Sequence, residues 1–214
     1  KELALSKDAP SKLSREALVT AVLGYNGFMQ ELIKAKTLGK SATKKRFAAY
    51  IYNNLETLKE VDPQNSPQYA YFQGETYMEL GKYKTATIIY TNAIKAANAQ
   101  KAPDMEVLKK VFDSIFKSME KSPTKNSRLV YIFESYLRHF PRSSKADSIH
   151  QRLIALSMKE KNKRPVLSRI ARYNKAYPQK INIQRDYYKQ LLNYYIDQKN
   201  TKALESLKSV LSKG

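Results

Sequence analysis

The stretch PQYAYFQGETYMELGKYKTATIIYTNAIKAANAQ, residues 67–100, decides the fold of this chain. A turn flanked by Gly81 and Tyr83 divides it into two segments whose apolar and small residues recur at helical spacing. Neither helix can bury its apolar face alone, so the pair requires stacked neighbours. The stretch therefore predicts one unit of a helical repeat, and with it an all-α protein.

Small and aromatic residues mark this unit on both helices. They are Gly74 and Tyr77 on the first helix and Ala86, Tyr90 and Ala93 on the second. Small residues let two helices approach closely, and the tyrosines fill the space beside them. The pattern resembles the tetratricopeptide repeat family, but it departs at Gln73, where an apolar residue is usual, and at Asn98, where a proline is usual. The resemblance implies a right-handed α-solenoid of stacked antiparallel helical hairpins.

The repeat extends along the chain. Proline cannot continue a preceding helix, and Pro63, Pro103, Pro141 and Pro178 lie 40, 38 and 37 residues apart. We therefore expect one domain over residues 13–214, after a lead-in or linker over residues 1–12. It would hold about five hairpins, at residues 13–62, 67–100, 103–141, 144–178 and 181–214. Core positions predicted in the fourth hairpin are Leu153, Ile154, Val166, Ile170 and Tyr173.

Composition argues against catalysis. The chain has no cysteine, and hence no disulfide, thiol nucleophile or cysteine-based zinc site. His139 and His150 do not form a metal-binding pair at helical spacing. Asp147, Ser148 and His150 contain the residue types of a hydrolytic triad, but neighbours on one helix point to different faces. We expect no enzyme activity, no metal, no cofactor and no small-molecule substrate.

No apolar run approaches the ~20 residues of a membrane-spanning helix.

Stacked hairpins place their first helices along a concave wall, where ligands of the tetratricopeptide family commonly bind. The resemblance assigns this partner-binding groove to Tyr71, Glu75, Met78 and Glu79 in the second hairpin and to Tyr188, Leu192 and Tyr195 in the last. Packing against a neighbouring repeat is the alternative role for these residues. The Lys and Asn residues that grip a peptide carboxylate in chaperone-binding members are not evident.

Positive charge is concentrated in the C-terminal half. The chain carries a net charge of +20, and residues 105–214 hold 24 basic and 9 acidic residues. A predicted basic face consists of Lys159, Lys161, Lys163, Arg164, Arg169, Arg172 and Lys175. It could meet an acidic protein, anionic lipid or nucleic-acid phosphate. A solvated surface that keeps the protein soluble is the alternative.

The segment ESYLRHFPRSSKA, residues 134–146, is similar to repeats of bacterial envelope proteins. The Lys-, Asn- and Tyr-rich helical composition is similar to that of scaffold subunits around flagellar motors. These resemblances favour a location in the bacterial periplasm or cell envelope. The cytoplasm is the alternative location. The leading hypothesis is a noncatalytic scaffold that binds a protein partner. The alternative is a basic helical-repeat protein that binds nucleic acid or anionic membrane surfaces, whose binding would weaken steeply with salt.

Overall fold

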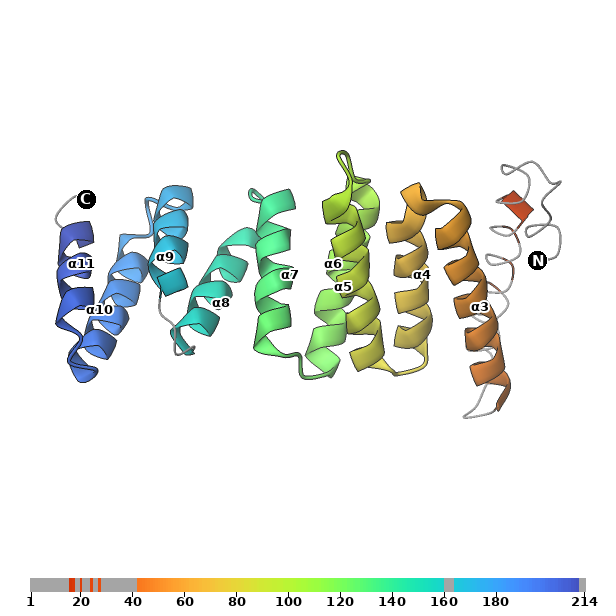
Figure 1. Cartoon of the computed structure of the whole chain (residues 1–214), viewed down its shortest axis with the longest axis horizontal. Coiled ribbons are helices and arrows are strands. Elements are labelled where there is room, and N and C mark those ends of the chain that lie inside the picture. The colour runs from red at the N-terminus through yellow and green to blue at the C-terminus, as the bar shows by residue number, and fades with distance from the viewer. Residues whose placement is uncertain are drawn as a thin grey trace. The chain divides into compact units, whose positions relative to one another are not determined.

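The computed structural model describes residues 16, 17, 20, 24, 27, 42–159 and 164–211. The expectation of an all-α protein is confirmed, because this part of the chain contains helices and no strand. The helices are α3 (Ala42–Val61), α4 (Ser66–Glu79), α5 (Tyr83–Ala99), α6 (Met105–Lys121), α7 (Asn126–His139), α8 (Ala146–Lys159), α9 (Arg164–Ala176), α10 (Ile181–Asp197) and α11 (Thr201–Leu211), with a short 3-10 turn η1 (Pro63–Asn65) before α4 (Figure 1). The predicted lead-in over residues 1–12 and the first helix of the first hairpin lie outside the described residues, apart from the five isolated positions.

The chain divides into two compact units, Lys1–Ser135 and Tyr136–Gly214, which are called the N-terminal and C-terminal units below. In the N-terminal unit, α4 packs against α3, α5 and α6, and α5 also packs against α6. In the C-terminal unit, α9 packs against α8 and α10, and α10 packs against α11. All of these pairs except α4 with α6 are helices that follow one another in the sequence.

The hairpin of α4 and α5 depends on a left-handed residue at the turn. Gly81 has φ +68°, a conformation that costs a non-glycine residue roughly 1–2 kcal/mol. The Gly81 amide donates to the Met78 carbonyl at 2.9 Å and the Lys82 amide to the Tyr77 carbonyl at 2.9 Å. These two hydrogen bonds form a Schellman motif, which satisfies the last carbonyls of α4 and reverses the chain.

Close contact between α4 and α5 centres on Gly74 and Tyr90. Tyr90 is fully buried, and a Cβ atom added at Gly74 would lie 2.1 Å from its ring. No side chain larger than hydrogen fits there without displacing the ring. The close approach that the small residues predicted is thus a direct contact between Gly74 of α4 and Tyr90 of α5.

Polar side chains tie this hairpin to the helices on either side. The buried Gln73 donates to Glu56 of α3 at 2.7 Å and accepts a hydrogen bond from Lys59. Asn98 of α5 donates to the Tyr131 hydroxyl at 2.9 Å and to Ser135 Oγ at 3.0 Å, both on α7. Gln73 and Asn98 are the two departures from the tetratricopeptide pattern, and each provides hydrogen bonds between neighbouring helices.

Amphipathic periodicity explains α6, which covers α5. The Asp104 carboxylate caps the helix by accepting from the amides of Glu106 and Val107 at 2.9 and 3.1 Å. The apolar face recurs every three or four residues and is buried at Leu108, Val111, Phe112 and Ile115. Thr87 of α5 and Ser118 of α6 are hydrogen-bonded to each other at 2.8 Å beside this face.

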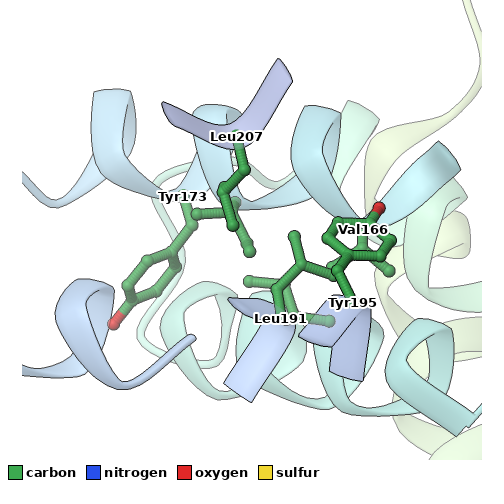
Figure 2. Packing of buried hydrophobic residues seen from close by; sticks show 7 residues of the cluster. Val166, Tyr173, Leu191, Tyr195 and Leu207 are labelled. Atoms are coloured by element: carbon green, nitrogen blue, oxygen red, sulfur yellow. The ribbon is translucent and has the colours of Figure 1, made fainter. Parts of the chain in front are cut away.

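The core of the C-terminal unit joins α8, α9, α10 and α11. Its buried members are Ile154, Val166, Ile170, Tyr173, Leu191, Tyr195 and Leu207. Figure 2 shows Leu207 of α11 and Leu191 of α10 entering the space between Tyr173 and Val166 of α9. The predicted core positions of the fourth hairpin are confirmed, because Leu153 is fully buried as well.

Candidate partner-binding surfaces

The predicted groove residues of α4 divide into two pairs. Tyr71 and Glu75 are half-buried, and Glu75 accepts a hydrogen bond from the Tyr90 hydroxyl. The rings of Tyr71 and Tyr90 lie 6.4 Å apart. Met78 is half-buried and Glu79 is exposed at the C-terminal end of α4. Tyr71 and Glu75 therefore contact residues of the hairpin itself. Met78 and Glu79 have side-chain surface that a partner could contact.

Tyr71 and Tyr90 both remain protonated at physiological pH. Burial raises the pKa of Tyr90 far above its ordinary value, and the hydrogen bond to Glu75 raises that pKa further. Burial and the Glu75 carboxylate likewise raise the pKa of Tyr71. Neutral phenols next to a carboxylate act as hydrogen-bond donors, so this part of α4 offers positioning and contact area rather than proton transfer.

The predicted groove residues of α10 occupy three different environments. Tyr188 is half-buried, and its hydroxyl accepts a hydrogen bond from Asn174 Nδ2 at 3.1 Å. Leu192 is 37% exposed. Tyr195 is buried in the core beside Leu191, because residues four apart share one face of a helix. Of the three, Leu192 is the one whose side chain is open to a partner.

Sequence reasoning missed two residues of α10, Ile181 and Ile196. They are 51% and 54% exposed, the largest exposures among the large apolar side chains of the described residues. Ile196 follows Leu192 by four residues, and this spacing was the available signal that both lie on one face. The offset that relates Tyr71, Glu75 and Met78 to Tyr188, Leu192 and Tyr195 also relates Glu79 to Ile196, so the register of α4 indicated this position as well.

The predicted basic face is only partly present at the surface. Lys159, Arg172 and Lys175 are exposed. Arg169 is 8% exposed and donates a hydrogen bond to Ser157 Oγ of α8. Lys161, Lys163 and the side chain of Arg164 lie outside the described residues.

The burial of Arg169 follows from helix geometry. A spacing of three residues drifts by about 60° per step around a helix with 3.6 residues per turn. Arg169, Arg172 and Lys175 therefore spread over about 120° rather than forming one ridge. The first of them, Arg169, lies about 40° from the buried Tyr173, at the edge of the buried face of α9, and joins the interior.

Asp147 forms an internal polar cluster at the start of α8. It accepts hydrogen bonds from Lys180, from the Tyr173 hydroxyl at 3.0 Å and from Gln151 at 3.0 Å. Burial raises the pKa of Asp147, but the hydrogen bonds from Lys180, Gln151 and Tyr173 outweigh it, and the pKa of this carboxyl is lowered overall. The cluster links the start of α8 to α9 and to the turn before α10.

The neighbours of Asp147 in the sequence point elsewhere. Ser148 donates to the Lys145 carbonyl at 3.0 Å. The His150 ring lies 6.0 Å from the rings of both Tyr173 and Tyr177 in edge contacts. The three residue types of a triad are thus engaged separately. Among the described residues, no cluster of three His, Cys, Asp or Glu side chains is arranged to hold a metal ion.

An open cavity of about 540 Å³ lies where η1 and the start of α4 meet the loop between α5 and α6. Its walls include Pro63, Pro67 and the side chain of Gln100, which donates to the Gln64 carbonyl at 2.7 Å. This hydrogen bond joins the two loops across the sequence. The cavity lies away from the groove residues of α4, which do not line it.

No protein-family model matches the chain, and no curated protein is significantly similar to it. None of the helices in the described ranges is long and apolar enough to cross a membrane.

Proposed function

We propose that this protein is a noncatalytic scaffold of tetratricopeptide-like repeats that binds another protein. In this proposal the helices form a right-handed α-solenoid of about five stacked antiparallel hairpins. The observation that carries it is the hairpin of α4 and α5, in which Gly74 contacts Tyr90 directly while Gln73 and Asn98 bond to the preceding and following helices.

This hairpin has the properties that a stacking unit needs. Its interior closes by contact between a glycine and an aromatic ring, which keeps the two helices close. It also forms hydrogen bonds to other helices. Gln73 bonds to Glu56 and Lys59 of α3, and Asn98 bonds to Tyr131 and Ser135 of α7. A unit that depends on both neighbours favours a repeat array over an isolated hairpin.

The end of α4 is the proposed contact surface of the N-terminal unit. Met78 offers a flexible apolar side chain and Glu79 an exposed carboxylate, next to a surface fixed by the bond between Glu75 and Tyr90. A preorganised surface with a few anchors is typical of protein recognition. The roles of Asp147, Tyr173 and Arg169 are structural in this proposal, since their side chains bond to other residues of the fold.

The compartment in this proposal is the bacterial periplasm or cell envelope, in an assembly such as a flagellar motor. It rests on the resemblance of residues 134–146 to envelope repeat proteins and on composition.

The test is capture of partners from a lysate of the source organism with the immobilised full chain, washed at low and high salt and treated with nuclease. We expect a defined protein to survive both treatments. Glu79→Lys should reduce its recovery, whereas Glu120→Lys, the same charge reversal at an exposed site on α6, should not. Recovery only of material that nuclease or salt removes would refute the scaffold and favour a binder of nucleic acid or anionic membrane.

A further inference from the structure

Helix α10 carries a second apolar surface besides its buried one. Its exposed members are Ile181, Leu192 and Ile196, and the half-buried Tyr188 borders them. At about 100° per residue these four side chains fall within a sector of about 80°. We call them the α10 strip. With a rise of about 1.5 Å per residue, the strip extends about 22 Å along the helix.

The α10 strip is distinct from the core face. Leu191 and Tyr195 pack with α9 and α11, and their directions differ from that of the strip's centre, near Leu192, by about 60–100°. A helix at the surface of a globular protein needs only one apolar face. On α10 a second apolar face contains three large side chains, each of which has about a third to a half of its surface exposed. Such a face is typical of a surface that another molecule covers.

Charge around the α10 strip indicates what covers it. Arg185 lies within the strip's sector and Lys189 about 20° beyond its edge. Both are exposed, and neither forms an ion pair among the described residues. The C-terminal unit as a whole holds 18 basic and 5 acidic residues. A second copy would bring the same positive charge to the contact, so repulsion opposes self-association and favours an acidic partner.

The narrow width of the α10 strip favours a single helix over a flat anionic membrane as the occupant. Its three exposed side chains fall within a sector of about 80°, whereas a helix that lies on a bilayer buries a broad apolar face. A single helix covers a narrower surface than a bilayer does. The length and narrowness of the strip match about four turns of an amphipathic helix.

We propose that the α10 strip binds an amphipathic helix of an acidic protein. Apolar side chains of that helix, spaced three and four residues apart, cover Tyr188, Leu192 and Ile196, and its flanking carboxylates lie near Arg185 and Lys189. The inference rests on the proposed scaffold function and specifies the class of partner.

The test uses the full chain and two fluorescein-labelled helical peptides of about 18 residues, which is long enough to cover the strip. Both peptides carry leucine at helical spacing, one with glutamates and the other with lysines beside the leucines. Fluorescence anisotropy should show at least about tenfold tighter binding of the glutamate peptide. The double variant Leu192→Asp/Ile196→Asp should weaken that binding at least about tenfold.

The matched control is Gln190→Asp/Asn193→Asp, which adds the same charge at exposed positions of α10 outside the strip. It should change the affinity less than about threefold, and circular dichroism should show that both variants keep their helix content. Absence of saturable binding of the glutamate peptide, or equal weakening by both variants, overturns the inference. Two other results also overturn the inference. One is dimerisation of the chain in sedimentation, and the other is binding to phosphatidylglycerol vesicles in place of the peptide, provided that the strip variant abolishes the association.

The strip and the scaffold function can fail separately. If the strip variant still captures the lysate partner of the full chain, the scaffold function stands and the assignment of its partner to the strip fails. If neither chain captures a protein partner, the scaffold function fails, and the peptide measurement reports on the strip by itself.

Discussion

Replacing Gly74 by alanine tests whether α4 and α5 approach as closely as the structure describes. In an unconstrained helix interior this substitution stabilises by about 1 kcal/mol, because glycine has the more flexible backbone. At this position the new Cβ would lie 2.1, 2.5 and 2.6 Å from three ring atoms of Tyr90. Carbon atoms pack favourably at about 3.5–4.0 Å, so the ring or the helix has to shift by more than about 1 Å.

Tyr90 has little freedom to move away. Its side chain is fully buried, and its hydroxyl donates to Glu75. Overpacking a buried site typically costs about 1–3 kcal/mol, and loss of a hydrogen bond to a charged group costs about 1.5–3 kcal/mol. After the gain of about 1 kcal/mol in helix propensity is subtracted, we expect Gly74→Ala to lower the free energy of unfolding by about 1.5–5 kcal/mol.

Urea denaturation followed by far-ultraviolet circular dichroism measures this change. The same substitution in a Tyr90→Leu background provides the control, because the smaller side chain removes the ring that the Cβ meets. In that background we expect the cost of Gly74→Ala to fall below about 1 kcal/mol. An alanine variant as stable as the wild type or more so would refute the close contact, and so would an equal cost in both backgrounds.

Three further predictions concern the turn and the polar contacts. Gly81→Ala should lower the free energy of unfolding by roughly 1–2 kcal/mol, measured in urea, because position 81 has φ +68°. Asn98→Ala should cost about 1–2 kcal/mol, since it removes the hydrogen bonds to Tyr131 and Ser135, and a calorimetric Tm equal to that of the wild type would contradict this. Asp147→Asn should cost about 1 kcal/mol at pH 7, and this difference should disappear in a pH series of urea melts as the pH falls below about 4. The sign follows because the folded state lowers the pKa of Asp147, so its stabilisation is present above the ordinary carboxyl pKa and is lost as the pH falls through the lower folded value.

Local sequence signals predicted that the chain is helical and that four prolines separate helices. The prolines at 63, 103 and 178 lie between helices in the structure, as does Pro141. The small residues of the hairpin indicated that its two helices approach closely, and in the structure Gly74 and Tyr90 form that contact.

The orientation of individual side chains was harder to predict. Arg169 was placed on a basic surface and Tyr195 in a groove, and both are buried. A rotation of about 60° around a helix separates a buried residue from an exposed one, and a register carried over from another repeat is not accurate to that angle. The exposed Ile181 and Ile196 were not among the predicted site residues, because an exposed apolar side chain can be recognised only when the position of the core face is known.

The departures from the repeat pattern at Gln73 and Asn98 have a physical interpretation. An apolar residue at position 73 and a proline at position 98 would serve any neighbouring hairpin, because apolar contacts are not directional. Gln73 instead bonds to Glu56 and Lys59, and Asn98 to Tyr131 and Ser135, so each requires particular partners at particular distances. A satisfied polar contact at a helix interface becomes costly when its partner is absent, and it therefore disfavours other stacking orders. In an array of similar hairpins, these two residues favour α3 before the α4–α5 hairpin and α7 after it.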